Sequence, residues 1–476
     1  MQSILKKIED IFFGNYDLSV VDQKTRLFHF HQTTIFDNFV SYLKCNFKYR
    51  VCIDTIKFHH NPDLDCAILL LNEERSSRII ATCKSAVKIK IPSMMDYFEK
   101  DNDKDNDKDN NSIESIGATK GAIYLLKNGD LFVHSKGPVF ENQFKTIVPS
   151  ISWSFLWDQW VRKIFELKTP LAIQAMKVVL CELERINNHI NYMITIVRNL
   201  GGLADLRDHS DFNNHIKESI NFCQEIFSIL FISDFHYNYG VNNQYKYDLA
   251  LSVQTAQSKI DGHLLNRILE FITKFKRFIL VFEKRIFSLH LRYKLQGKME
   301  YEGDNILRLS SKVGLSGPYL RALGVSYDVR KSFPYLLYSQ IDFYVPVGAS
   351  SISILGNILN MRMEEMKESL KIIDLIVKNF PQLDVLNVLD VNNKFGAIDI
   401  ECIEKIRKKL VYEAFEGSEG EMGISAVIVN CDCDCDSYDS GSGSGSNSTL
   451  KKNALFKMDI EYKLKSAAIM NSSIQY

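Results

Sequence analysis

The stretch VGLSGPYLRALGVSYDVRKSFPYLLYSQIDFYVPVG, residues 313–348, combines turn-forming residues, charges of both signs and aromatic rings more densely than any other part of this chain. Gly317-Pro318 and Gly324 permit tight turns. Five tyrosines and several charged residues lie in an otherwise apolar run; the charged residues are Arg321, Asp328, Arg330, Lys331 and Asp342. A surface loop seldom has this composition. It therefore predicts a segment packed around a cavity or against other chains.

Helical periodicity flanks this stretch on both sides. Apolar residues recur at helical spacing between Pro170, where a helix can begin, and Gly201, where one can end. About thirty residues predict a helix roughly 45 Å long. Two more helices are predicted, over residues 255–295 and 361–379.

Three polar residues share one face of the first predicted helix. Glu182, Arg185 and His189 are spaced three and four residues apart, beside the apolar stripe. One interpretation is a solvated polar face. The other is a polar cluster that anchors the helix to another subunit or lines a cavity, because buried charges need partners. Both stay open, and we take the three residues as interface candidates.

The first 100 residues predict a small α+β domain. Runs rich in β-forming residues occupy 51–57, 66–71 and 85–91, and helical periodicity is present near 35–44. The run DNDKDNDKDNN that follows has no apolar residue and predicts a solvated linker over 101–112. A calcium-binding EF-hand loop is disfavoured there, because Asn and Ser replace its required Gly and Glu.

No metal-ligand set is predicted from the sequence. Residues 431–449 read CDCDCDSYDSGSGSGSNST, a flexible tether whose cysteines lack the two-residue gaps of paired thiolate ligands. The other seven cysteines are scattered singly, as is typical of a reducing compartment. The pairs His29/His31 and His59/His60 have no acidic or cysteine partner at helical spacing. We therefore expect no cofactor bound directly by this chain.

Charge and hydropathy narrow the class of protein. The 58 basic and 58 acidic residues give a formal net charge of zero, which argues against a dedicated nucleic-acid binder. No apolar run reaches the length of a membrane-spanning helix. The first twenty residues lack the apolar stretch of a signal peptide. We expect a cytoplasmic protein, or one held at the cytoplasmic face of a membrane by its partners.

The 313–348 stretch resembles the large-subunit family shared by the D-type subunit of respiratory complex I and the membrane-bound nickel–iron hydrogenases. The likeness rests on the Gly-rich turn and Arg321, on the run at 328–331, on Pro334-Tyr335, and on Asp342-Phe343 followed by VPVG. Four further segments are similar to parts of the same family: ELERINNHI (182–190), MRMEEMKESLKII (361–373), GAIYLLKNGDLFVHS (121–135) and GEMGISAVIV (420–429). VKIKIPSMMDYF (87–98) resembles the C-type subunit of complex I, and fused C/D-type chains occur in this superfamily.

The resemblance implies an α+β fold. A small N-terminal α+β domain precedes a mainly helical domain that is similar to the hydrogenase large subunit and carries minor β-hairpins. The expected divisions are a domain similar to the C-type subunit (1–100), the linker (101–112), a domain similar to the D-type subunit (113–430), a flexible insertion (431–450) and a C-terminal remnant of the D-like domain (451–476).

The resemblance also implies partners and a location. We expect an iron–sulfur partner similar to the B-type subunit of complex I and a membrane partner similar to its H-type subunit, with no nucleic acid. The chain would lie peripherally on the cytoplasmic side of the inner membrane, within a NAD-linked electron-transport complex. Its cofactors would be a quinone and the iron–sulfur cluster of a neighbouring subunit.

Departures from the family pattern bear on the chemistry. The two Cys-x-x-Cys pairs that hold nickel and iron in the hydrogenases are missing, so their metal has no thiolate cage. The family's quinone-contacting His and Tyr fall near Ile116 and Ile147, and its Arg-Met-His falls near 230–232, which reads Leu-Phe-Ile. An isoleucine side chain cannot donate a proton to a quinone oxygen.

Two main functions follow from the resemblance. The first is a docking subunit with reduced or no catalysis of its own. The second is an active quinone-reducing subunit, in which one of four tyrosines donates protons: Tyr319, Tyr327, Tyr335 or Tyr338. A third reading is an assembly factor outside any redox chain. The candidates for a quinone cavity or an interface between subunits are Arg321, Asp328, Arg330, Asp342 and Tyr335.

Overall fold

The structure, a computed structural model, describes residues 2–57, 66–84, 118–126, 131–136, 171–199, 245–246, 262–286, 314–348, 354–380, 410–430 and 454–464, with isolated positions between 152 and 221. The predicted strand at 85–91, the linker at 101–112 and the insertion at 431–450 lie outside these residues. So do the positions near Ile116, Ile147 and 230–232.

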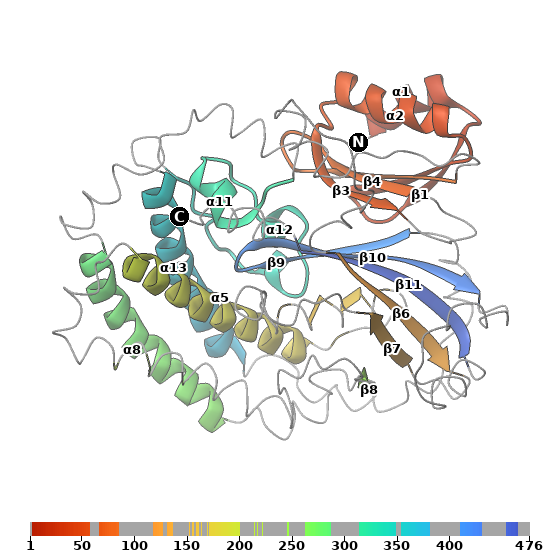
Figure 1. Ribbon diagram of the computed structural model, residues 1–476. Helices are drawn as coiled ribbons and strands as arrows, with labels where there is room; N and C mark the ends of the chain where they lie inside the picture. Colours follow the sequence, from red (N-terminus) through yellow and green to blue (C-terminus); the bar gives the residue numbers. More distant parts are fainter. Residues whose placement is uncertain are drawn as a thin grey trace, which may run out of the picture.

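An N-terminal five-stranded sheet forms the first layer. It comprises β1 (Tyr16–Val20), β2 (Thr25–Phe30), β3 (Val51–Lys57), β4 (Cys66–Leu71) and β5 (Arg78–Cys83), in the order β1-β2-β5-β4-β3. Only the β2–β5 pair is parallel. Two helices, α1 (Gln2–Phe12) and α2 (Thr33–Asn46), cover one face (Figure 1). The predicted strands at 51–57 and 66–71 and the helix near 35–44 are confirmed.

Strands β2, β4 and β5 of this sheet are buried on both faces. Phe28 and Phe30 pack with Phe39 under the helices, whereas Leu27 and Ile80 belong to the core of the rest of the chain. Every residue of β5 is buried. Strands covered on both sides carry continuous apolar runs rather than alternation. The middle of β5, residues 79–81 (IIA), is such a run.

A second sheet of six strands unites segments from distant parts of the chain. Its strands are β6 (Ala118–Leu126), β7 (Leu131–Lys136), β8 (Tyr245–Lys246), β9 (Leu410–Gly417), β10 (Gly420–Asn430) and β11 (Ala454–Leu464). Their order is β8-β7-β6-β11-β10-β9, and all neighbours are antiparallel. The segments 121–135 and 420–429, which resemble a hairpin and a strand of the family, lie in β6–β7 and β10 and are joined through β11.

Three long helices form the third layer. They are α5 (Leu171–Asn199), α8 (Gly262–Ile286) and α13 (Ile354–Asn379), and α13 packs against the other two (Figure 1). The predicted helices are confirmed where the structure describes them; α8 lies within the predicted 255–295, whose ends fall outside the described residues, and α13 differs in its start. Helix α13 begins seven residues before the predicted start at 361, because Leu355, Ile358 and Leu359 continue its buried stripe.

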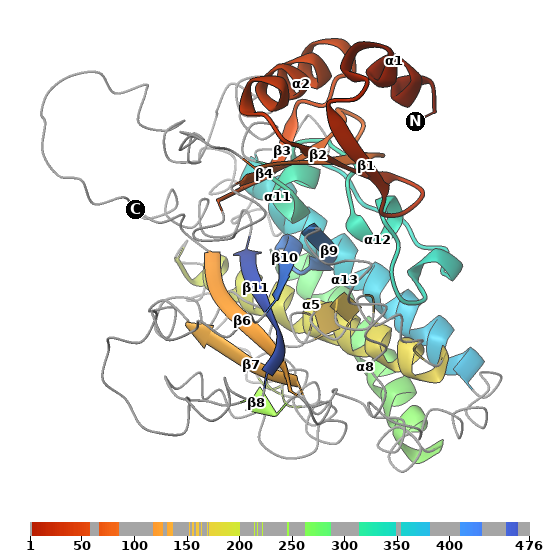
Figure 2. The same ribbon diagram turned by 90° about the vertical axis from the view of Figure 1, so that its right-hand side faces the viewer.

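The 313–348 stretch lies between the long helices and the N-terminal sheet (Figure 2). It forms the short helices α11 (Gly317–Ala322), α12 (Val329–Ser332) and η1 (Tyr338–Gln340). Gly317 has a φ of 74° and lies against the backbone of Glu419 and Gly420, in the turn between β9 and β10. A Cβ atom at Gly317 would overlap that backbone. Glycine is therefore required for this close approach.

A buried ion pair joins the N-terminal sheet to the rest of the chain. Arg78 on β5 donates from Nη2 to Oε1 of Glu421 on β10 at 2.8 Å, and both side chains are almost fully buried. The hydroxyl of Tyr327 donates to the other oxygen of Glu421 at 2.7 Å. Arg75 donates to the carbonyl of Leu315 at 2.6 Å. The N-terminal sheet thus contacts both the 313–348 stretch and the β10 strand.

Gly317→Ala is expected to cost roughly 3 kcal/mol of unfolding free energy, because it adds a steric overlap to the strain of a positive φ. Gly14→Ala is the matched control: Gly14 has a φ of 76° and no neighbouring atom within 4 Å of its Cβ position. The control should cost only about 1 kcal/mol. Denaturant titration of both variants measures the difference, and equal losses would contradict the proposed contact.

Candidate functional site

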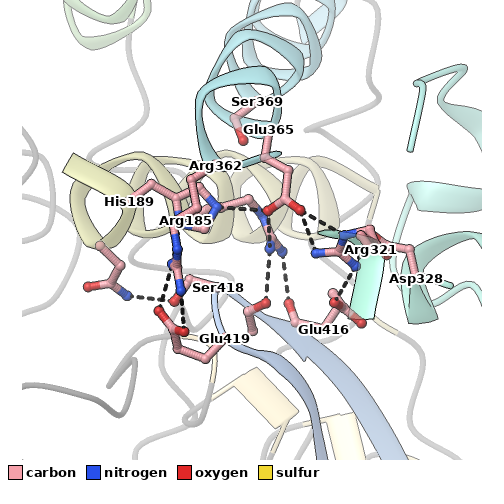
Figure 3. A network of polar contacts seen from close by, with 12 residues as sticks. Arg185, His189, Arg321, Asp328, Arg362, Glu365, Ser369, Glu416, Ser418 and Glu419 are labelled. Carbon is pink, nitrogen blue, oxygen red and sulfur yellow. Dashed lines mark hydrogen bonds and ion pairs between the residues drawn. The ribbon is translucent and has the colours of Figure 1, made fainter. Parts of the chain in front are cut away.

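A buried network of arginines and carboxylates lies where the β9–β10 turn meets the helices. Side chains from α5 and α13 point toward this turn, and those of the 313–348 stretch reach it from the side (Figure 3). The members are Glu182, Arg185, His189, Arg321, Asp328, Arg330, Arg362, Glu365, Glu416 and Glu419.

Arg321 occupies the centre of the network and is fully buried. Its Nε donates to Oε1 of Glu365 at 2.7 Å, and its Nη1 donates to Oε1 of Glu416 at 3.0 Å. The same Nη1 donates to the carbonyl of Tyr327 at 2.9 Å. One guanidinium thus links α11, α13, β9 and the segment that leads into α12. Its fixed planar fork suits it to this geometry better than a lysine ammonium would.

Asp328 and Arg330 form a second, local pair. The Asp328 carboxylate caps α12 by accepting from the backbone N–H of Arg330 at 2.9 Å, and Nη2 of Arg330 lies 2.6 Å from Oδ2 of Asp328. Arg330 also donates from Nη1 to Oε1 of Glu182 on α5 at 2.9 Å. Glu182 accepts further bonds from the hydroxyls of Tyr338 at 2.5 Å and Ser369 at 2.6 Å. Four chain segments therefore meet at the Glu182 carboxylate.

The protonation state of His189 follows from its two partners. Nη1 of Arg362 lies 3.0 Å from Nδ1, and an arginine can only donate, so Nδ1 must accept. Nε2 then carries the hydrogen and donates to Oε2 of Glu365 at 2.7 Å. The imidazole is neutral in this arrangement. Burial lowers the pKa of His189 to about 4, although the bond to Glu365 opposes that shift.

Two arginines hold the turn between β9 and β10. Arg185 donates to the backbone carbonyls of Glu416 and Gly417, at 2.9 Å each. Arg362 makes a bidentate pair with Glu419, at 2.8 and 2.5 Å, and its guanidinium stacks 3.7 Å from the ring centre of Tyr192. The network therefore fixes the backbone of the turn as well as its side chains.

Charge within the network is nearly balanced. Four guanidinium groups, on Arg185, Arg321, Arg330 and Arg362, face five carboxyl groups, on Glu182, Asp328, Glu365, Glu416 and Glu419.

Four of these carboxyl groups have lowered pKa values, because neighbouring arginines outweigh the cost of burial. Glu416 differs: burial and the Asp328 charge raise its pKa to about 7, against the opposing effect of Arg321. Of the five carboxyl groups, Glu416 is therefore the one that is protonated most readily, and its protonation removes the excess negative charge.

The structure brings together most of the residues that the sequence singled out. Arg321, Asp328, Arg330, Glu182, Arg185 and His189 all belong to the network, and the hydroxyl of Tyr335 accepts from the backbone N–H of Glu416 at 3.0 Å. The solvated-face interpretation of Glu182, Arg185 and His189 is wrong, since each is at most 2% exposed. Their contacts described above are within this chain, and a role in contacts between subunits stays a prediction.

Asp342 lies apart from the network. Its side chain is fully exposed, and its ion pair with Lys331 is long, at 3.7 Å. Four network residues were not singled out from the sequence: Arg362, Glu365, Glu416 and Glu419. The first two lie in MRMEEM at helical spacing from the apolar stripe, which was a usable signal. Glu416 and Glu419 lie in the β9–β10 hairpin, where no local pattern marks them.

The histidines on the N-terminal sheet have partners other than a metal. His29 and His31 lie on β2 and just after it; His31 pairs with Asp17 at 3.3 Å, and Nδ1 of His29 is 3.0 Å from the hydroxyl oxygen of Thr82. Within the described residues, no three His, Cys, Asp or Glu side chains are grouped so that they could hold a metal ion. None of the described helices has an apolar stretch long enough to cross a bilayer.

Comparison with known proteins shows which family part of this chain is similar to. Residues 270–429 match the family described as respiratory-chain NADH dehydrogenase, 49 Kd subunit. This range holds α8 from residue 270 onward, the 313–348 stretch, α13 and the β9–β10 hairpin up to residue 429, and therefore most of the network.

Curated relatives agree. The D-type NADH-quinone oxidoreductase subunit of Chlorobaculum tepidum is 27% identical over 269 residues, which cover 55% of this chain and 59% of that protein. The D-type subunit of Campylobacter curvus is 26% identical over 233 residues, covering 48% and 50%. The C/D-type subunit of Cronobacter sakazakii is 26% identical over 237 residues, covering 47% and 33%.

Most of the buried network between the helices and the β9–β10 hairpin therefore lies in the part of the chain that is similar to the 49 Kd subunit of respiratory-chain NADH dehydrogenase. More specifically, the relatives that it resembles are D-type subunits of NADH-quinone oxidoreductase and a C/D-type subunit. Its match spans three fifths or less of the length of these three relatives.

His189 is expected to stay neutral down to about pH 4, and folded stability should fall as pH drops below 6.5. In that range the unfolded chain takes up a proton that the folded chain refuses, which costs about 3 kcal/mol in all. Carbon-13 NMR of labelled histidine measures the titration, with His189→Gln used to assign the resonance. An imidazole that titrates near 6.5 would contradict the assigned hydrogen bonds.

Arg321→Leu is expected to cost about 3–5 kcal/mol of unfolding free energy, because it leaves the carboxylates of Glu365, Glu416 and Asp328 without their shared cation. Asp342→Asn is the control, since an exposed side chain should change the value by less than about 0.5 kcal/mol. Denaturant titration compares the two variants. If Arg321→Leu were as stable as Asp342→Asn, the central position of Arg321 would be refuted.

Proposed function

We propose that this chain is a docking subunit of a membrane-associated complex similar to NADH-quinone oxidoreductase, with reduced or no catalysis of its own. Similarity to the 49 Kd subunit of respiratory-chain NADH dehydrogenase and to D-type subunits supports the subunit role. In this proposal the chain binds an iron–sulfur subunit and a membrane subunit at the cytoplasmic side of the inner membrane. A quinone and an iron–sulfur cluster belong to the assembled complex rather than to this chain.

The proposal rests on the hydrogen bonds that the tyrosine hydroxyls make within this chain. The hydroxyls of Tyr338 and Tyr327 donate to Glu182 and Glu421, at 2.5 and 2.7 Å. The Tyr335 hydroxyl accepts from a backbone N–H, and that of Tyr319 lies 3.1 Å from the hydroxyl of Tyr192. All four candidate proton donors are therefore buried and hydrogen-bonded within the chain.

The pKa values of these four tyrosines also support a structural role. Burial raises the pKa of each of these four tyrosines above its usual value, and the carboxylates beside Tyr327 and Tyr338 raise it further. A general acid works best when its pKa lies near the working pH. Hydroxyls that hold their protons this firmly suit a structural role.

The charged groups of the network are engaged in the same manner. The carboxylates of Glu182 and Glu365 each accept from two or more side chains of this chain. A ligand that bound there would have to break these bonds in a buried setting, at a cost of about 1–3 kcal/mol for each group left unpaired. The network therefore fits a scaffold that fixes the positions of α5, α13 and the β9–β10 turn.

One observation favours the alternative, an active quinone-reducing subunit. The pKa of Glu416 is raised to about 7, so this carboxyl group can exchange a proton near neutral pH. Buried groups with shifted pKa values occur at catalytic sites more often than elsewhere. Against this, both oxygens of Glu416 accept hydrogen bonds, from Arg321 and from the backbone N–H of Val329.

The two functions differ in what a hydroxyl deletion should do. Tyr338→Phe and Tyr319→Phe keep the rings and remove the candidate protons. In the complex purified through a tag on this chain, we expect NADH:quinone activity to stay within about twofold for both variants. A drop of more than about a hundredfold in a complex of unchanged composition would overturn the docking proposal in favour of the quinone-reducing one.

The docking role has its own measurement. The chain purified from its source is expected to bring down an iron–sulfur subunit and a membrane subunit, identified by mass spectrometry. Arg321→Ala should reduce their recovery, whereas Asp342→Asn, an exposed control, should not. A chain that co-purifies with no iron–sulfur subunit would refute the docking role and indicate an assembly factor.

A further inference from the structure

Helix α8 is fixed in one orientation by its aromatic face. Phe271, Phe275, Phe278 and Phe282 form a continuous ladder, with ring centres 5.2 to 5.4 Å apart, and all four are buried. Ion pairs bind one edge of the helix to α13: Lys276 to Asp374 at 3.4 Å, and Glu283 to Lys367 at 2.8 Å. The opposite face therefore points away from the bundle.

That outward face is basic and partly apolar. Lys274, Arg277, Val281 and Lys284 follow one another at spacings of three and four residues, so they form one stripe, and Leu280 lies beside it. All five side chains are exposed; Leu280 is 58% exposed and Val281 48%.

Glu270 is the exposed acidic residue on the same stripe. Within the described residues, Lys274, Arg277 and Lys284 form no ion pair.

The position of α8 leaves this face accessible in the described part of the chain. In Figure 1 the helix lies at the outer side of the helical layer, beyond α5 and α13 and far from both sheets. The surface stripe is about 15 Å long, given 1.5 Å of rise for each of its residues. It is long enough to meet a flat surface along three turns.

The residue types of the stripe indicate what kind of surface it would bind. Protein interfaces are depleted in lysine, whereas lysines that flank exposed aliphatic residues are typical of helices that lie on anionic membranes. Lysine and arginine pair with lipid phosphates, and leucine and valine enter the boundary between headgroups and acyl chains. An acidic protein surface would match the charge but would leave Leu280 and Val281 facing polar groups.

We propose that the outward face of α8, formed by Lys274, Arg277, Leu280, Val281 and Lys284, binds the surface of a membrane that contains anionic lipids. The contact would be made by this chain itself and does not require a membrane subunit. It goes beyond the docking role proposed above, and either proposal can fail without the other.

Vesicle flotation with the purified full chain tests the proposal. The probes are vesicles of phosphatidylcholine alone and of phosphatidylcholine mixed with phosphatidylglycerol. We expect binding to the mixed vesicles only, weakening as salt is raised. Replacing Lys274, Arg277 and Lys284 together by Gln should weaken it by about a hundredfold, at roughly fivefold for each cation.

Two further variants separate the contributions. Leu280→Ser with Val281→Ser should weaken binding by about tenfold and leave its salt dependence unchanged. The matched control replaces three exposed lysines of the N-terminal domain, Lys6, Lys7 and Lys84, by Gln and should bind as the unmodified chain does. Circular dichroism confirms that each variant is folded.

Three outcomes would overturn the proposal: no binding of the unmodified chain to mixed vesicles, equal binding by the triple α8 variant, or equal loss in the Lys6, Lys7 and Lys84 control. Loss of binding on adding inorganic phosphate at constant ionic strength would also overturn it, because it would indicate a site for free phosphate. Co-purification of partner subunits, measured separately, reports on the docking role alone.

Discussion

The structure depends on one buried cation. Arg321 has no exposed surface, and an unpaired charge in that position would be prohibitively costly. Its partners come from elements far apart in sequence: Glu365 on α13, Glu416 on β9 and the carbonyl of Tyr327. These elements must assemble together, since no subset of them satisfies the guanidinium. Such networks add less to net stability than their number of bonds suggests, because desolvation offsets most of the attraction. What they add here is a single permitted arrangement of helices and hairpin.

The β9–β10 hairpin connects the buried network to the N-terminal sheet. Glu416 and Glu419, at its turn, bind Arg321 and Arg362, while Glu421, two residues further, binds Arg78 of the N-terminal sheet. Alternate residues of a strand point to opposite faces, but the turn at Gly417–Gly420 reorients the chain and lets neighbouring acids face different partners. One short segment thus contacts the helical layer on one side and the N-terminal sheet on the other.

The sequence predicted the secondary-structure elements better than the contacts between them. The three long helices, two strands and the dense 313–348 stretch each carry a local signal, either a period of 3.6 or a run of β-forming residues. Strands β1, β2 and β5 were not predicted, and neither was the pairing of β11 with β6, across more than 300 residues of sequence. The residues of a strand do not specify with which other strand it pairs. For the same reason the interpretation of the polar stripe of α5 stayed open: Glu182, Arg185 and His189 have their partners on other elements, which the pattern of one helix does not identify.

The type of cation differs between the buried network and the exposed face of α8. All four cations of the buried network are arginines, whereas two of the three on the outward face of α8 are lysines. A guanidinium is weakly hydrated and planar, so it can leave water and still fill several directed bonds. An ammonium is strongly hydrated and sits on a flexible stem, which suits a surface that must meet mobile phosphates. Three of the five charged residues in the apolar run 313–348, Arg321, Asp328 and Arg330, are therefore paired in the interior, whereas the exposed cations of the proposed membrane-binding face lie on α8.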